Sequence, residues 1–531
     1  MRYVDLPTRS WVPQWLGLFT MFMIMTSVVL VNGTYMGSSI DLSGALGTTS
    51  EDIMMAYYAT SVGVVAANPL VHRIRKAVTS KTLILADMAL QVVLSLVCAE
   101  TTSMDLLILC SFFMGMLKTT LIVEFIVLIT PLLSPGRVRS EYFSYFFPIV
   151  FGGGLVSMSL TAWLANSYRW QYTYYFIIVL LLVTMACVFI FFRDARRPHE
   201  FPFHEINYRS IFLVSAAYLM IVYVLTYGKT LDWLESPRIR LFSAAGVFLF
   251  LTFLYHVHTT HKPYISLRPL LRLKQVLGYV FMLFCMVLNN DTTLVNSYVT
   301  GVLGLDNVHS YRLGLWSIAG YALAGVVSFW WFRWQRWRFR YLVSGAFWLF
   351  ALHYAMLFTG ISPDASYEAL YVPMVLRGAA MMLLVIAFGV FTAEDLPQGE
   401  LVSNTFFLIT VRSVIGPVLA SCLMANGLYR LQVEALDRLA AHLTSVDGMA
   451  AARQTEGIAG ALAQGKSYAD ALLTANQSLY ATLQMQGTLW ALKHLFGALL
   501  LAAIVLAVVS AFIPFHKTVR VDVVKTGEDM A

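Results

Sequence analysis

Three strongly polar residues, Asn289, Asn290 and Asp291, stand together inside an apolar stretch that runs from 276 to 299. The stretch is long enough to cross a bilayer as a helix, which needs about 20 residues. Because successive residues turn by ~100° around a helix, the three side chains cannot all face one packed neighbour. Polar groups are costly in hydrocarbon, so we expect a bent or water-lined helix here. An acid so placed can exchange a proton or an ion, or bind a ligand, and Asp291 is the principal candidate.

Six further ionisable residues fall inside apolar stretches, namely Asp87, Lys118, Glu124, Arg377, Arg412 and Lys493. Lys118 and Glu124 are six positions apart, which separates them by ~9 Å along a helix and rotates them by ~120°. Each therefore needs a partner on another helix, or water. We expect Glu124 to support Asp291, and Lys118 or Arg377 to pair with Asp291 in one conformational state and release it in another. A static buried ion pair is the alternative.

The composition is that of a polytopic membrane protein. Of the 531 residues, 59% are hydrophobic and only 12% are charged, which is too apolar for a soluble protein with separate cores. The net charge of +7 does not indicate a nucleic-acid partner, because Lys and Arg lie in short runs between apolar segments, as topology determinants do. The five cysteines fall inside apolar segments and are interpreted as packing residues.

Runs of about 18 or more mostly apolar residues predict fourteen membrane-spanning helices and a multi-pass protein of the cytoplasmic (inner) membrane. Lys and Arg gather on one side of the alternating segments, which places both termini in the cytoplasm. One supposedly cytoplasmic segment breaks the pattern, since Glu394, Asp395 and Glu400 make it acidic. The expected spans are 13–35, 52–71, 82–99, 104–131, 142–165, 172–192, 209–227, 240–257, 276–300, 312–332, 341–360, 369–392, 402–424 and 491–514.

Three of the membrane ionisable residues have plainer interpretations. Asp87 lies towards the cytoplasmic end of its span, where an acid is typically a structural partner of an arginine or of the backbone. Arg412 and Lys493 have long side chains that can reach the membrane interface from a helix end. No metal-ligand spacing, nucleophile elbow or phosphate loop is present, so we expect neither an enzyme nor a metal or other cofactor.

The loop 425–490 is the only sizeable segment predicted outside the membrane. Leucines and valines recur in it at helical spacing, with interruptions near 445–448 and 465–467, which predicts amphipathic helices. Such helices would form a cap over the outer mouth. The alternative is a docking surface for a periplasmic adaptor protein.

Several short motifs resemble the fourteen-helix drug–proton antiporter family of the major facilitator superfamily. The resemblance extends from about residue 13 to 515 and rests on Val31-Asn32, the helix end and turn 162–172, Leu376-Arg377-Gly378, Ser403-Asn404-Thr405 and Val411-Arg412-Ser413-Val414-Ile415-Gly416. It implies a major facilitator fold of two six-helix bundles, within 1–200 and 263–531, with a transmembrane hairpin inserted at 201–262. It also implies a ligand or ion role for Asn32 and a structural or gating role for Asp87 and Arg412.

Other family motifs are altered in this chain. Ser27 stands where the family carries a first-helix Asp, Lys76 stands about where a loop Asp belongs, and Ser111 replaces an Arg while Gly115 is retained. The Gly-Pro-rich motif of the fifth helix survives only as Gly152, Gly153 and Gly154, to which the resemblance gives a gating role.

The leading hypothesis is a secondary active transporter that uses an ion gradient to export small hydrophobic or amphipathic compounds. A pocket with few charges favours such ligands over very polar ones. A proton-coupled peptide importer is a second hypothesis, although the Glu-rich first-helix motif of that family is absent between Trp15 and Tyr35. A membrane scaffold or receptor of transporter fold without transport is the third.

Overall fold

The computed structural model describes residues 8–37, 39–75, 77–133, 138–194, 206–260, 263–334, 338–394, 396–441, 448–513 and 515. Within them the chain is almost entirely helical, and the single β-type pairing is an isolated bridge between Thr8 and Phe192. Thirteen helices or joined helices are long and apolar enough to cross a membrane, and a further apolar helix covers Gln14–Leu30. The predicted all-α polytopic fold is thereby confirmed.

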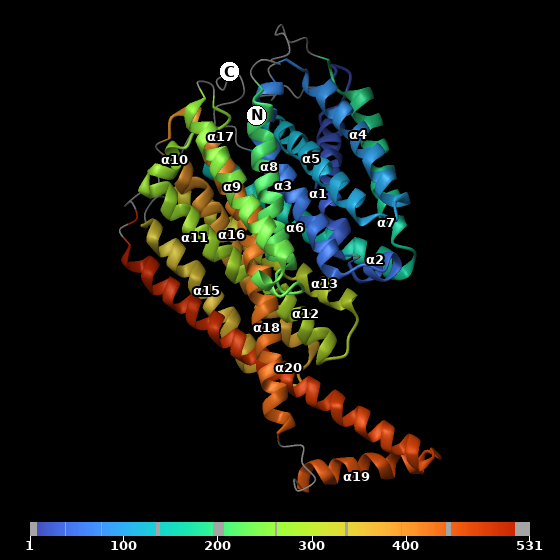
Figure 1. Cartoon of the computed structure of the whole chain (residues 1–531). Helices are drawn as coiled ribbons and strands as arrows, with labels where there is room; N and C mark the ends of the chain where they lie inside the picture. The colour runs from blue at the N-terminus through green and yellow to red at the C-terminus, as the bar shows by residue number, and fades with distance from the viewer. Residues whose placement is uncertain are drawn as a thin grey trace.

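The first half of the chain forms one group of helices (Figure 1). It contains α1 (Gln14–Gly37), α2 (Ser39–Leu46), α3 (Ser50–Ile74), α4 (Ser80–Glu100), α5 (Met104–Leu133), α6 (Arg139–Ser167) and α7 (Gln171–Phe191). Helices α3 and α5 pack backbone to backbone through glycines, since a Cβ atom on Gly63 would lie 2.1 Å from the Phe112 carbonyl oxygen. A Cβ on Gly115 would lie 2.0 Å from the carbonyl oxygen of Thr60. Small residues give membrane helices this close approach.

The second half contains most of the remaining helices. They are α10 (Arg268–Leu271), α11 (Leu273–Asn289), α12 (Thr292–Gly301), α13 (Asn307–Leu315), α14 (Ser317–Trp334), α15 (Phe339–Gly360), η3 (Tyr367–Leu370), α16 (Tyr371–Ala393), α17 (Gln398–Ile409), the π-helical segment η4 (Thr410–Ile415), α18 (Gly416–Ala440), α19 (Gly448–Ala463) and α20 (Tyr468–Phe512). The predicted spans 276–300 and 312–332 are each built from two helices, α11 with α12 and α13 with α14.

Helices α6 and α3 of the first half both pack on helices of the second half. Helix α6 packs against α13, α14 and α16, and α3 packs against α17 and η4. The approach of α6 to α14 is close, because a Cβ on Gly325 would lie 2.7 Å from the Ser144 carbonyl oxygen. Within the second half, Gly378 brings α16 against α14, since its Cβ would lie 2.4 Å from the Ser317 carbonyl oxygen. This contact fixes Ser317 beside the N-terminal part of α16.

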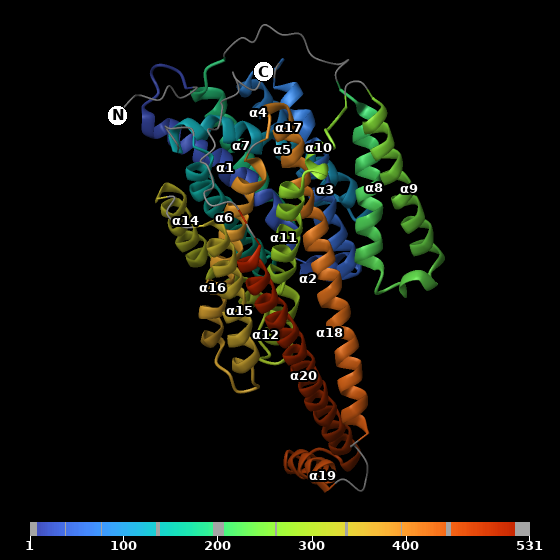
Figure 2. The same ribbon diagram turned by 90° about the vertical axis from the view of Figure 1, so that its left-hand side faces the viewer.

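Helices α8 (Tyr208–Tyr227) and α9 (Pro237–Thr259), joined through η2 (Trp233–Glu235), form a hairpin at the edge of the molecule (Figure 2). Helix α8 packs on α3 and α18, and so contacts both halves. At one end of the hairpin, the Tyr227 hydroxyl donates to Asp52 Oδ1 at 2.5 Å, and Trp233 Nε1 donates to Asn426 Oδ1 at 3.2 Å. The division of the chain at 201–262 stays a prediction.

The acidic segment after α16 is neutralised by basic residues around α10 and α11. Glu394 pairs with Lys274 at 2.6 Å, and Glu400 pairs with Arg272 at 3.1 Å. Asp395 lies outside the described residues. The exception in the charge pattern therefore reflects local ion pairs and does not require a different number of spans.

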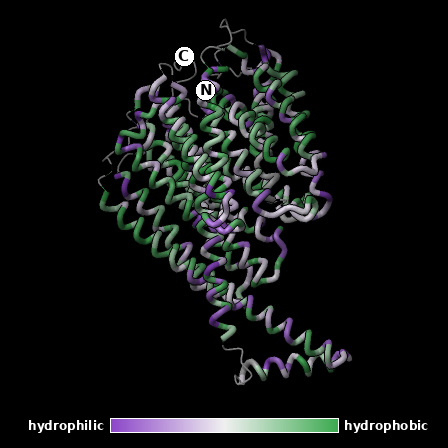
Figure 3. Tube along the Cα trace, in the orientation of Figure 1, coloured by the Kyte–Doolittle hydropathy of each residue, from purple (hydrophilic) through white to green (hydrophobic). Residues whose placement is uncertain are grey.

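The described residues of the segment 425–490, which exclude 442–447, are mostly helical, as predicted, but they do not form a cap. Helices α18 and α20 continue well beyond the bundle, and α19 packs on α20 at their far end, so the three form a stalk that projects away (Figure 1). Helix α20 begins at Tyr468, far ahead of the predicted last span. Hydrophobic residues dominate the bundle, whereas the stalk alternates hydrophilic and hydrophobic positions (Figure 3). Two helices of the stalk, α18 and α20, run without interruption into the bundle.

Candidate functional site

The helix that carries the three consecutive polar residues is broken at them. Helix α11 ends at Asn289 and α12 begins at Thr292, so Asn290 and Asp291 lie between the two. Backbone groups freed by such a break need other partners inside a membrane. The Tyr354 hydroxyl donates to the Leu288 carbonyl oxygen, and Asn290 Nδ2 donates to the Pro417 carbonyl oxygen at 3.0 Å. The predicted bend is confirmed.

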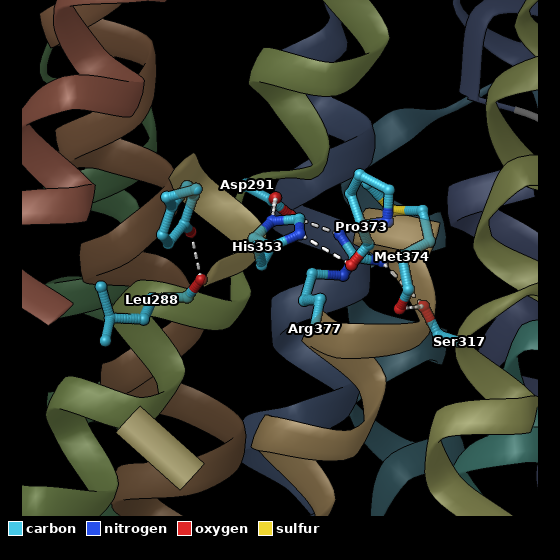
Figure 4. A network of polar contacts seen from close by, with 8 residues as sticks. Leu288, Asp291, Ser317, His353, Pro373, Met374 and Arg377 are labelled. Atoms are coloured by element: carbon cyan, nitrogen blue, oxygen red, sulfur yellow. Dashed lines mark hydrogen bonds and ion pairs between the residues drawn. The ribbon is translucent and has the colours of Figure 1, made fainter. Parts of the chain in front are cut away.

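Asp291 is fully buried at the centre of a polar cluster (Figure 4). Arg377 Nη1 of α16 donates to Asp291 Oδ1, and His353 Nε2 of α15 lies 2.8 Å from Asp291 Oδ2. Side chains of two other helices, α15 and α16, thus converge on one carboxyl group at the junction of α11 and α12. Of the two basic residues expected to pair with Asp291, the structure brings Arg377 and not Lys118.

The partners of Asp291 are themselves held in place. Arg377 Nη2 lies 3.4 Å from Ser317 Oγ, whose hydroxyl donates to the Met374 carbonyl oxygen at 3.0 Å. His353 Nδ1 lies 2.8 Å from the Pro373 carbonyl oxygen, and the imidazole is fully buried. The close glycine packing of α14 on α16 therefore positions the guanidinium, and α16 orients the imidazole through Pro373.

The hydrogen bonds of His353 require an exchangeable proton. A carbonyl oxygen can only accept, so Nδ1 must carry a proton to bond Pro373. The contact between Nε2 and Asp291 then needs a second proton, either on Nε2 of an imidazolium or on Oδ2 of a neutral carboxylic acid. In both forms the pair holds one proton more than a neutral histidine beside a carboxylate. The geometry thus places one shared proton between His353 and Asp291.

Glu124 lies in a separate ion pair. Arg75 Nε, just past the end of α3, donates to Glu124 Oε1 at 2.5 Å, and Glu124 is fully buried on α5. Its Oε2 atom is buried and has no hydrogen-bond partner among the described residues. The structure thus pairs Glu124 with Arg75 and shows no contact between Glu124 and Asp291 among the described residues, so the support of Asp291 by Glu124 stays a prediction.

Asp87 and Lys118 are both buried, with different surroundings. Gln91 Nε2, one turn further along α4, donates to Asp87 Oδ2 at 2.9 Å, so the partner is an amide of the same helix instead of an arginine. The Lys118 side chain is only 6% exposed and makes no hydrogen bond or ion pair with the part of the chain that the structure describes. Lys493 is exposed on α20.

Arg412 contacts aromatic rings of the opposite half. Its guanidinium carbon lies 5.2 Å and 5.6 Å from the ring centroids of Phe147 and Phe151 on α6. Its Nε atom is buried without a hydrogen-bond partner among the described residues. Arg412 therefore does not reach the membrane interface from a helix end, as a lipid-facing arginine would.

The three consecutive glycines of α6 have different environments. A Cβ on Gly152 would contact Ile318 of α14 at 3.6 Å, and one on Gly153 would lie 3.2 Å from Val29 Cγ1 of α1. Nothing lies within 4 Å of a Cβ on Gly154. Asn289 is the half-buried last residue of α11, and the side chain of Asn32 lies outside the described residues.

Sequence reasoning missed His353 and Arg75. His353 is a histidine in the middle of the apolar stretch 341–360, and this position is the only local signal for it. Arg75 belongs to a basic run next to a helix end, which resembles a topology signal. Both partnerships join residues far apart in the chain.

Comparisons with known proteins agree with this architecture. The family model of the Major Facilitator Superfamily matches residues 15–421. Among solved structures, a mutant of the peptide transporter POT in complex with alafosfalin is similar, with 12% identity, a TM-score of 0.55, and coverage of 96% of this chain and 98% of that one. An auto-inhibited POT family peptide transporter has 11% identity and a TM-score of 0.51, with 91% and 96% covered.

A mutant of the nucleoside transporter NupG has 11% identity and a TM-score of 0.50, with 91% of this chain and 99% of that one covered. At such low identities these likenesses concern the fold alone. No curated protein matches the sequence.

Proposed function

The chain belongs to the Major Facilitator Superfamily, and from this premise we propose that it is a secondary active transporter driven by a proton gradient. The observation that carries the proposal is the hydrogen-bonding of His353, which requires a proton shared with Asp291. Transporters commonly place substrate and coupling-ion sites at broken membrane helices, as at the junction of α11 and α12.

Loss of the shared proton removes one hydrogen bond from the cluster. Without it, one of the two His353 contacts has no hydrogen, so the imidazole must turn or lose a partner. Asp291 then relies on Arg377 for its neutralising charge. Tyr354, the next residue after His353, bonds the backbone at the end of α11, so a shift of α15 acts directly on the helix break. This is the switch between conformational states that we propose.

The first-helix position where related antiporters carry an acid has a structural contact here. Ser27 lies 2.9 Å from Thr184 Oγ1 of α7, and its hydroxyl also donates to the Met23 carbonyl oxygen at 3.0 Å. A serine cannot hold a transported proton. The proposed coupling group therefore lies in the second half of the chain.

We propose export of hydrophobic or amphipathic compounds across the cytoplasmic membrane, with both termini in the cytoplasm. The support is the small number of charged groups in the membrane helices and the resemblance to drug–proton antiporters. In this orientation the stalk is outside, where it is available to a periplasmic adaptor protein.

Peptide import is the second candidate function. Two of the solved structures with TM-scores above 0.5 are peptide transporters, and a proton-binding cluster serves import as well as export. Direction and substrate distinguish the two candidates.

The test is transport in proteoliposomes that hold a pH-sensitive dye, under imposed proton and sodium gradients, with a panel of amphipathic compounds and short peptides. We expect compound-dependent proton movement that Asp291→Asn abolishes and His353→Gln strongly reduces. Asp364→Asn, which removes an exposed loop acid, is the matched control. Wild-type proton-coupled flux in Asp291→Asn would overturn the assignment. Absence of flux with every compound would favour a scaffold or receptor.

A further inference from the structure

We propose that Arg412 binds a negatively charged group of the transported compound, so that the substrates are amphipathic anions. The inference rests on the proposed transport function and names the substrate class for it.

An irregular helical turn presents Arg412. The segment Thr410–Ile415 is π-helical and is followed directly by Gly416 and Pro417. Pro417 has no N–H to donate to the preceding turn, so the regular hydrogen-bond pattern is interrupted there. A Cβ on Gly416 would lie 2.5 Å from the Val411 carbonyl oxygen and 2.7 Å from Met286 Cβ, so the wide turn packs tightly on α11. Single π-helical turns occur frequently at functional sites.

The charge of Arg412 is not neutralised by the protein. The side chain makes no ion pair with the described residues, and its Nε atom is buried without an acceptor. The rings of Phe147 and Phe151 supply a cation–π attraction, which is weaker than the interaction with a carboxylate. A guanidinium presents several donors in a fixed fork that matches the oxygens of carboxylate, sulfonate or phosphate groups.

The pairing of the other cations in the membrane helices also supports an anionic ligand. Arg377 is neutralised by Asp291, and Arg75 by Glu124. Lys118, like Arg412, has no acidic partner among the described residues. An unpaired guanidinium inside a membrane is costly, and a bound anion offsets this cost.

The surroundings of Arg412 suit an apolar body attached to the anion. The Phe151 ring lies 6.4 Å from the Tyr321 ring of α14, so aromatic groups of both halves meet beside the guanidinium. The Pro417 carbonyl, which follows the π-helical turn, accepts the hydrogen bond of Asn290 at 3.0 Å. Movement of Arg412 on binding an anion is thereby transmitted to the residue next to Asp291.

Binding of three matched compounds to the purified full chain in detergent tests the proposal without any gradient. The probes are 1-naphthoate, the uncharged 1-naphthalenemethanol and the cationic 1-naphthylmethylamine, measured by equilibrium dialysis. We expect the wild type to bind naphthoate roughly tenfold or more tightly than the other two, as a charge-assisted hydrogen bond allows. Arg412→Ala should abolish this preference. Arg412→Lys should keep part of it, because the charge remains and the planar fork is lost.

Lys493→Ala is the control, since it removes an exposed cation of a membrane helix and should leave the preference unchanged. Arg412→Ala leaves no acid without its partner, so the variant should elute as a monodisperse protein like the wild type. Equal binding of the three probes by the wild type, absence of binding, or an unchanged preference in Arg412→Ala would overturn the proposal. Asp291→Asn should still prefer naphthoate, so loss of proton coupling and loss of anion binding are distinguishable.

Discussion

Removal of Arg377 should destabilise the protein much more than removal of an exposed arginine. The Asp291 side chain is 0% exposed and the Arg377 side chain 9%, so their ion pair is buried. Breaking such a pair by removing one partner costs about 3–5 kcal/mol, because a charge is left in an apolar interior. The proton shared by His353 and Asp291 remains beside the carboxyl group in Arg377→Met, so we expect the lower end of this range.

The double variant Asp291→Leu with Arg377→Met removes both charges and leaves His353 with its Pro373 contact alone. Replacing a buried ion pair by apolar residues is often close to neutral. The double variant should therefore be more stable than Arg377→Met alone, and the two substitutions should be strongly non-additive. Free energies of unfolding in mixed detergent micelles, with increasing denaturing detergent, measure this.

Arg438→Met is the matched control, because Arg438 pairs with Glu434 at 2.5 Å but its side chain is 66% exposed. Exposed pairs within one helix contribute only about 0.3–0.5 kcal/mol. A loss below about 1 kcal/mol for Arg377→Met, or a double variant as unstable as the sum of the single variants, would refute the reasoning.

Three further predictions follow from the packing, the stalk and the ion pairs. Gly378→Ala should lower the melting temperature, because its Cβ would lie 2.4 Å from the Ser317 carbonyl oxygen. Gly154→Ala should leave the melting temperature unchanged, because nothing lies within 4 Å of its Cβ. Equal melting temperatures of the two variants would contradict the close packing of α16 on α14. Deleting 430–485 with a short linker should preserve transport in proteoliposomes, and normal transport in intact cells would then exclude adaptor docking. Lys274 and Glu394 pair at 2.6 Å, so exchanging the two residues should restore the stability that either single charge reversal loses. Thermal unfolding measures this. A double variant no more stable than the single variants would show that the pair does not act alone.

The broken helix was predictable from sequence because its cause is local. Three consecutive polar residues in an apolar stretch conflict with a continuous buried helix, whichever neighbours surround it. The partners of Asp291 were only partly predictable. Arg377 is a cation in an apolar span and is conspicuous for that reason, whereas a buried histidine such as His353 is recognised as a partner only when α15 and α11 are seen side by side.

The stalk shows a different limit of sequence reasoning. Its amphipathic pattern predicted helices, but hydropathy marks only the part of α20 that is apolar enough to lie in a membrane. The polar part from Tyr468 onwards belongs to the same helix, and nothing in its composition indicates which direction it takes. Similarly, Gly416 and Pro417 indicate an irregular helix, but the position of Arg412 over the rings of α6 depends on the packing of the two halves.

The protonation state of His353 decides whether this residue and Asp291 share a proton. In protein labelled with 15N-histidine, the ring signals that disappear in His353→Gln belong to this residue, and their chemical shifts report which nitrogens carry protons. We predict a protonated Nδ1 in the wild type, bonded to Pro373, and a change at Nε2 in Asp291→Asn. A neutral His353 protonated only at Nε2 would contradict it, because Asp291 and His353 would then share no extra proton.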